Sequence, residues 1–193
     1  GKVDEINHIL QRSLRMAFGL AFAFILLQQP LLRFSLWVMK SSPDVSIMAG
    51  SYFQILIWGA PAMLGIYSLA GWFLGQQNAR VPMIVAILQN VINILVSMLL
   101  TMYFDWKVEG IAVGTLVSQW IAFFMYIFFP LTNHRPIDVL WRKLSSQAEL
   151  PWGRFLSVNR DIFFRTLCLV AVQLFFTATG ATQSDTILAA NAL

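Results

Sequence analysis

The sequence is poor in charge and in cysteine. Charged residues make up 11% of its 193 residues, whereas an ordinary soluble domain carries about 25%. The single cysteine, Cys168, cannot form a disulfide within the chain and indicates no redox compartment. Hydrophobic residues reach 58%, with 16 Phe and 7 Trp. These figures exclude soluble domains, disordered chains and disulfide scaffolds, and they indicate a membrane protein.

The sequence also lacks the patterns of soluble catalysis and of metal binding. It contains no HExxH, GxSxG or P-loop motif and no Cys/His spacing that would hold a metal. Its 9 acids lie in predicted connections or at predicted helix starts, where a carboxylate caps a helix. We therefore expect no enzyme activity, no catalytic residue, no metal and no cofactor. The net charge of +4 does not indicate nucleic acid, because the basic residues lie between apolar segments.

Five apolar segments are long enough to span a membrane as helices, which takes about 20 residues. None alternates with the period of a barrel strand, so we expect an all-α polytopic protein. We expect Pro30 to bend or end the first helix, Gly59 and Pro61 to kink the second, and Pro82 to open the third. The predicted spans are residues 16–38, 46–74, 82–103, 109–131 and 161–180, with the start of a sixth near Asp185.

Basic residues are unevenly distributed among the connections. Ten of the 13 Lys and Arg lie before the first span, between the second and third, or from the end of the fourth span through Arg165 near the start of the fifth. By the positive-inside rule, residues 1–15, 75–81 and 132–159 are cytoplasmic. We expect residues 1–15 to be a loop that enters the first helix. Residues 132–159 read as a linker with a short amphipathic helix, built on Ile137, Leu140, Trp141 and Leu144.

The third span carries polar residues inside an apolar helix. Asn90, Asn93 and Ser97, followed by Thr101, lie on one face about 80° wide. An unpaired amide in hydrocarbon costs several kcal/mol, so this face must point toward other helices or a wet cavity. Two interpretations stay open: these residues line a cavity, or they hold helices together by hydrogen bonds.

Other spans carry residues that could meet this face. Small residues at four-residue spacing on the fourth span permit close helix packing: Gly110, Gly114 and Ser118. Further polar groups that could converge are Gln54, Gln89, Gln119 and Gln173.

Three runs of residues in the first four spans resemble a known family. They are residues 71–82 (GWFLGQQNARVP), 90–94 (NVINI) and 108–112 (VEGIA). Their order and spacing resemble the MATE (multidrug and toxic compound extrusion) family. Residues 158–162 (VNRDI), with Gly180-Ala181 and Asp185 after them, are similar to its DinF-like branch. The resemblance covers nearly the whole chain.

The MATE family has twelve spanning helices in two lobes around a central cavity. The resemblance implies that this chain, which begins with Gly1, is a piece holding the third to seventh helices and the start of the eighth. Residues 1–131 would be the last four helices of the first lobe with the preceding loop. Residues 132–159 would be the inter-lobe linker, and residues 160–193 the first helix and following turn of the second lobe.

The resemblance implies a secondary active efflux transporter of the inner (cytoplasmic) membrane. It would exchange cationic or amphiphilic small molecules, such as drugs and toxic compounds, for protons or sodium. Its partners would be the bilayer, the small-molecule substrate and the remaining helices of the full-length chain.

Asn93 matches the asparagine of the family, whereas Ser97 stands where many members carry an aspartate. We therefore expect Asn90, Asn93 and Ser97 to line the substrate or ion cavity, and Ser97→Asp to be tolerated. One alternative is a lipid-linked saccharide flippase of the related superfamily, which the absence of Lys or Arg at mid-membrane disfavours. Another is a membrane scaffold without transport activity.

Overall fold

The computed structural model describes residues 2–39, 43–128 and 164–172, together with positions 136, 139, 153, 157 and 160. The chain divides into two units, residues 1–148 and 149–193. All regular elements in the described ranges are helices, and no strand occurs there. The predicted all-α membrane fold is therefore confirmed.

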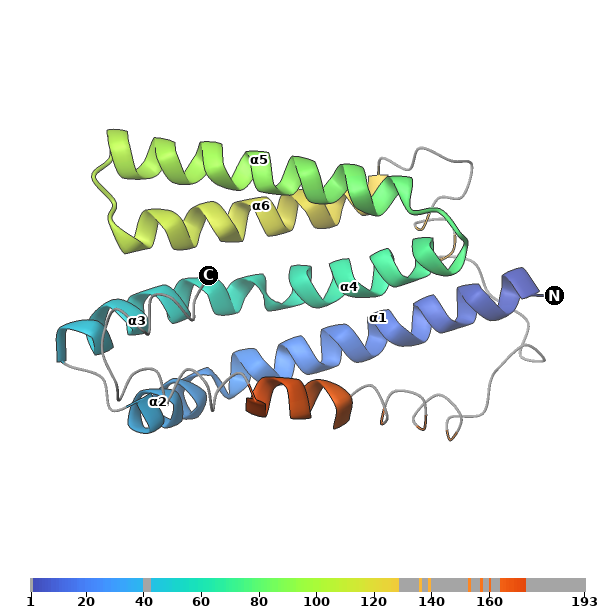
Figure 1. The fold of residues 1–193 in the computed structure, drawn as a ribbon, viewed down its shortest axis with the longest axis horizontal. Helices are drawn as coiled ribbons and strands as arrows, with labels where there is room; N and C mark the ends of the chain where they lie inside the picture. Colours follow the sequence, from blue (N-terminus) through green and yellow to red (C-terminus); the bar gives the residue numbers. More distant parts are fainter. Residues whose placement is uncertain are drawn as a thin grey trace. The chain divides into compact units, whose positions relative to one another are not determined.

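The described helices of the first unit follow one another along the chain as Figure 1 shows. They are α1 (Lys2–Leu26), α2 (Gln28–Met39), α3 (Pro43–Leu56), the 3-10 helix η1 (Ile57–Gly59), α4 (Ala60–Gly75), α5 (Arg80–Tyr103) and α6 (Val108–Phe128). Within the described residues, four segments are long and apolar enough to cross a membrane: Ile6–Leu26, Ser46–Gly75, Arg80–Tyr103 and Val108–Phe128. In the second unit, residues 164–172 are helical and fall within the predicted fifth span.

The prediction that residues 1–15 form a loop was wrong. Residues 2–15, expected as a loop, belong to α1, and the first candidate span begins at Ile6 rather than at residue 16. The physical reason is an apolar stripe at helical spacing that is almost fully buried: Leu10, Leu14, Ala17 and Ala21. Because α1 packs on α4, the burial of this stripe favours a helix that continues through the basic positions Arg12 and Arg15.

The break between α1 and α2 follows from the chemistry of proline. Pro30 has no amide hydrogen for the carbonyl of Leu26, and its ring would collide with that carbonyl in a regular helix. α1 accordingly ends at Leu26. Helical hydrogen bonds continue around the break, from Leu27 N to Ala23 O at 2.9 Å and from Leu31 N to Leu27 O at 3.0 Å.

The second span is broken as predicted from Gly59 and Pro61. The 3-10 helix η1 separates α3 from α4, and Pro61 lies in the first turn of α4. Since Pro61 cannot donate to the carbonyl of Ile57, that carbonyl accepts the amide of Ala60 instead. The tighter bond is what converts this turn to 3-10 geometry.

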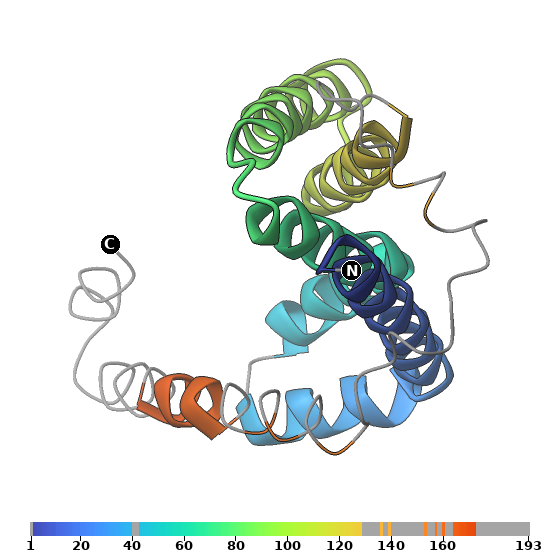
Figure 2. The ribbon, with the colours of Figure 1, turned by 90° about the vertical axis from the view of Figure 1, so that its right-hand side faces the viewer.

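α4 lies between α1 on one side and the antiparallel pair α5–α6 on the other (Figures 1 and 2). The indole Nε1 of Trp72 on α4 donates to Oδ1 of the buried Asn7 on α1 at 3.3 Å. An apolar core cluster accompanies this hydrogen bond and includes Leu10, Leu14, Leu69, Trp72, Phe73, Val81, Val85, Phe123 and Tyr126.

The start of α1, the α4–α5 connection and the end of α6 lie at the same end of the first unit (Figure 1). Val139 joins them, because its carbonyl accepts a hydrogen bond from Gln11 Nε2 at 2.7 Å and its side chain belongs to the core cluster. The distribution of Lys and Arg among the connections predicts that these segments lie on the same side of the membrane. Other predictions lie outside the described residues: the amphipathic helix of the linker, the ends of the fourth and fifth spans, and the sixth span.

Candidate functional site

The polar face of α5 packs on the small residues of α6. We call this contact the α5–α6 seam. Its members are Asn93, Ser97 and Thr101 on α5, and Gly110, Gly114, Thr115 and Ser118 on α6. The polar groups therefore meet a neighbouring helix rather than lipid, where nothing could pair them.

Asn93 is half-buried and hydrogen-bonded across the seam. Its Nδ2 donates to Thr115 Oγ1 at 3.0 Å and to Ser118 Oγ at 3.4 Å. Each hydroxyl in turn donates to its own helix, Thr115 to Ile111 O at 3.0 Å and Ser118 to Thr115 O at 2.8 Å. Both amide hydrogens are thus engaged, and Oδ1 accepts no hydrogen bond from any described residue. That oxygen is available to a cation or to an outside donor.

Ser97 lies at a close approach of the two backbones. A Cβ added to Gly114 would overlap Ser97 Oγ and would lie 2.9 Å from the Ser97 nitrogen and 3.0 Å from its Cα. Ser97 Oγ is buried and has no hydrogen-bond partner among the described residues. The seam has no room for a larger side chain here, so the structure argues against the expectation that Ser97→Asp is tolerated.

Thr101 closes the seam near the end of α5. Its hydroxyl donates to the Ser97 carbonyl at 2.8 Å and to the Met98 carbonyl at 3.2 Å. Its methyl group faces Gly110, where an added Cβ would lie 3.2 Å from Thr101 Cγ2. The Thr101 hydroxyl is therefore hydrogen-bonded within α5, and its methyl group packs against α6.

Asn90 does not take part in the seam. It is exposed, and its Nδ2 donates to the Ala86 carbonyl of its own helix at 2.9 Å. The structure thus brings Asn93 and Ser97 together against α6 and places Asn90 on a flank of α5 that no described helix covers. The cavity-lining role of these three residues stays a prediction.

Thr115 is the seam residue that the sequence analysis missed. It precedes Ser118 by three residues, and residues at that spacing are neighbours on a helix surface. A pair of hydroxyls beside the small-residue ladder could have identified it as a partner for an amide on the facing helix.

A second polar contact joins α6 to the break between α3 and α4. Trp120 Nε1 donates to the Trp58 carbonyl at 3.2 Å, which satisfies a backbone group of η1. Gln119 Oε1 occupies the space that a Cβ on Gly59 would fill, and this oxygen is buried without a partner in the described chain. Gln119 therefore faces the break. Of the other glutamines, Gln54 is exposed, and Gln173 lies outside the described residues.

The seam contains no charged group. The acid found within the described candidate spans is Glu109, in the first turn of α6. No cluster of three or more metal-binding side chains occurs in the ranges that the structure describes. Hydroxyl and amide groups do not change charge near neutral pH, so the seam can coordinate or orient a ligand but cannot take up a proton itself.

The model of the MatE family matches residues 1–99, more than half of the 193 residues. The chain belongs to the MatE family. DNA damage-inducible protein F of Escherichia coli (strain K12) is 28% identical over 190 residues, which cover 98% of this chain and 41% of that protein. Protein DETOXIFICATION 43 of Arabidopsis thaliana is 26% identical over 178 residues, covering 92% of this chain and 32% of that protein.

A protein named "Probable lipid II flippase MurJ", from Rhizobium meliloti (strain 1021), is 26% identical over 125 residues. The match covers 63% of this chain and 23% of that protein. No solved structure matches the chain. The chain spans less than half of the length of each of these relatives. The resemblance seen in the sequence, including its DinF-like branch, is confirmed, and MatE proteins are multi-pass membrane transporters rather than enzymes.

Proposed function

We propose that the full-length protein is a secondary active efflux transporter of the cytoplasmic membrane. It exchanges cationic or amphiphilic small molecules, including drugs and toxic compounds, for protons or sodium. The observation that carries the proposal is the Asn93 amide, which sits inside a membrane span of a MatE protein with its carbonyl oxygen unpaired. Relatives named DETOXIFICATION support the substrate class.

In this proposal Asn90, Asn93 and Ser97 line the substrate or ion cavity of the first lobe. Asn93 Oδ1 is a ligand, and Thr115 and Ser118 hold its amide in place. Coupling requires a group whose charge or coordination differs between the two access states. The neutral seam can take part through coordination, whereas a group that changes charge would come from the remaining helices of the full-length chain. The exposed flank around Asn90 is where those helices, or the substrate, would approach.

The proposed lobe organisation is residues 1–131 in the first lobe, 132–159 as cytoplasmic linker and 160–193 in the second lobe. The division into two units between residues 148 and 149 supports it, because this division falls inside the proposed linker. The shared location of residues 75–81, the start of α1 and Val139 supports one cytoplasmic side for all three.

The alternative is a flippase for lipid-linked saccharides, and the relative named as a lipid II flippase favours it. The absence of Lys or Arg at mid-membrane disfavours a flippase. In α1, Arg12 and Arg15 fall in the first half of the candidate span Ile6–Leu26, nearer the proposed cytoplasmic side.

Vesicles that carry the full-length protein and hold a cationic dye test the two proposals. We expect an imposed proton or sodium gradient to drive dye efflux, and the same vesicles not to move a fluorescent lipid-linked saccharide between leaflets. Saccharide movement without gradient-driven efflux would select the flippase. Absence of both activities in correctly folded protein would reject transport of either class.

A further inference from the structure

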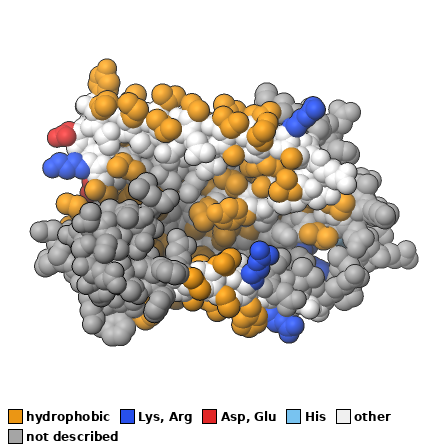
Figure 3. Space-filling view, viewed as in Figure 1, with side chains coloured by type: hydrophobic (Ala, Val, Ile, Leu, Met, Phe, Trp, Pro, Cys, Tyr) orange, Lys and Arg blue, Asp and Glu red, His pale blue; other side chains and the backbone are white. Residues whose placement is uncertain are grey.

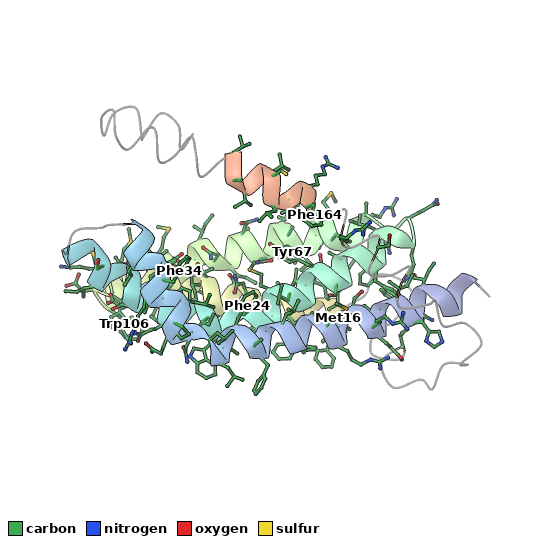
Figure 4. All side chains as sticks on the ribbon, turned by 90° about the horizontal axis from the view of Figure 1, so that it is seen from below. Met16, Phe24, Phe34, Tyr67, Trp106 and Phe164 are labelled. Atoms are coloured by element: carbon green, nitrogen blue, oxygen red, sulfur yellow. The ribbon has the colours of Figure 1, made fainter. Side chains whose placement is uncertain are left out.

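The turn between α5 and α6, residues 103–107, presents aromatic side chains outside the helix contacts. The exposed fractions of Tyr103, Phe104 and Trp106 are 85%, 60% and 46%. Figure 4 shows Trp106 at this end of the helices. Neither the Tyr103 hydroxyl nor the Trp106 indole nitrogen has a hydrogen-bond partner in the described chain. Two large side chains thus expose both an apolar body and an unused donor.

Backbone and ring contacts hold this turn in one conformation. The Leu100 carbonyl accepts hydrogen bonds from the amides of Phe104 and Trp106, each at 3.3 Å. Asp105 reverses the chain with a left-handed φ of 52°. The rings of Phe104 and Trp106 lie 6.3 Å apart, and an added Cβ on Gly110 would be 3.1 Å from Trp106 Cβ. The aromatic residues therefore form a fixed surface rather than a loose loop.

The length of α5 sets the depth of this surface. Its 24 residues extend about 36 Å, whereas the hydrocarbon core of a bilayer is about 30 Å thick. Arg80 at the start of α5 belongs in one headgroup layer, so Tyr103 at its end reaches the opposite layer. Figure 3 shows hydrophobic side chains along α5 between charged side chains at its two ends.

We propose that residues 103–107 bind the headgroup layer of zwitterionic phospholipids on the face opposite the α4–α5 connection. Indole and phenol groups suit this layer, because their rings enter the acyl boundary while the N–H and O–H donate to phosphate or ester oxygens. The local charges are Asp105, Lys107 and Glu109, so acids outnumber the base. Lys107 pairs with a phosphate and the acids attract the positively charged lipid ammonium, whereas anionic lipid gains no such pairing with the acids.

The test measures the depth of Trp106 in vesicles of phosphatidylcholine that carry the full-length protein. The difference in fluorescence emission between the wild type and Trp106→Phe is the emission of the Trp106 indole. Phe keeps an aromatic ring next to Phe104, so the turn should fold as before. If Trp106→Phe folds poorly, Trp106→Tyr is used in its place. We expect phosphatidylcholine brominated next to the headgroup to quench this emission more than lipid brominated at the chain ends. Trp58→Phe is the matched control, because Trp58 is 55% exposed near the middle of its span and should show the opposite order.

Three results would overturn the proposal. Equal, weak quenching by both lipids would place Trp106 in water, and stronger quenching by chain-end bromine would place it in hydrocarbon. Quenching that needs added phosphatidylglycerol and disappears at high salt would assign the surface to anionic lipid. Quenching that is unchanged by phosphatidylglycerol and by salt supports the zwitterionic assignment. No transport is measured, so the result is independent of the proposed transport function.

Discussion

The α1–α4 contact and the α5–α6 seam hold membrane helices together by different means. The first buries large apolar side chains, such as Leu10, Leu69 and Phe73, and includes a hydrogen bond between Trp72 and Asn7. The α5–α6 seam packs small residues closely together, and hydroxyl groups and the Asn93 amide lie between the two helices. Lipid supplies no hydrophobic driving force between helices, so close packing alone can hold a pair.

The difference bears on function, because the α1–α4 contact buries mainly apolar side chains, and Trp72 Nε1 and Asn7 Oδ1 in it are paired with each other. An amide inside α5 costs free energy unless it is paired, and the hydrogen bonds of Asn93 recover only part of that cost. Asn93 Oδ1 and Ser97 Oγ remain unpaired by the described residues in a seam that is closely packed. We infer that stability alone does not account for the seam, whereas it accounts for α1–α4.

The largest expected effect is that of Ser97→Asp. A carboxylate would replace a buried hydroxyl that already touches Gly114, so overpacking of about 1–3 kcal/mol adds to the cost of a charge inside a span, which is at most about 3 kcal/mol, at the helix centre. We expect a clear fall in the melting temperature of the full-length protein in detergent. Ser97→Ala is the control, because it removes a hydroxyl without a described partner and should melt like the wild type. Equal melting of all three proteins would show that the seam is looser than described.

Gly114→Ala should have the next largest effect. Its Cβ would meet backbone atoms of Ser97, which cannot rotate away, so the helices must separate at a cost of about 1–3 kcal/mol. Gly71→Ala is the matched control, since an added Cβ there has nothing within 4 Å. Thermal unfolding followed by size-exclusion chromatography measures both. A Gly114→Ala protein as stable as Gly71→Ala would contradict the close approach.

Trp72→Phe tests the α1–α4 side of the comparison. It keeps an aromatic ring in the core but removes the donor to Asn7, whose side chain is only 6% exposed. An orphaned buried acceptor costs about 1–3 kcal/mol, and we expect a value near 1 because the ring packing is kept. Efflux per folded molecule should not change. A loss of efflux at unchanged stability would show that the α1–α4 contact has a role in transport, which contradicts the assignment of function to the α5–α6 seam.

Asn90→Ala should change stability least. Its side chain is exposed and bonds only to its own helix, so we expect a change within about 0.5 kcal/mol. Efflux should still fall, because the exposed amide is proposed to face the cavity. Normal efflux in this variant would restrict the site to Asn93 and Ser97.

Local sequence rules predicted the parts of the fold that depend on local chemistry. The break at Pro61 follows from one missing amide hydrogen, and the shared face of Asn93 and Ser97 follows from helical spacing. The helix over residues 2–15 was missed because Arg12 and Arg15 suggested a loop, although the stripe through Leu10 and Leu14 was present.

The candidate site was only partly predictable because it depends on how two helices align. Periodicity gives the face of α5 but not its register against α6, and the register decides which residue Asn93 meets. Thr115 could therefore not be assigned as its partner. The same limit applies to Asn90, which shares the polar face but lies beyond the part that α6 covers.

We propose that Asn93 acts in transport and not only in helix packing. Asn93→Ala removes the carbonyl oxygen and the hydrogen bonds to Thr115 and Ser118, whereas Thr115→Val removes only the first of these bonds and keeps the carbonyl. The decisive measurement is gradient-driven efflux per folded molecule from vesicles carrying each full-length variant. Each bond is worth about 0.6 kcal/mol on average, so the stabilities of the two variants should differ by only about one such bond. We predict that efflux falls much further in Asn93→Ala than in Thr115→Val, and unchanged efflux in Asn93→Ala would contradict the claim.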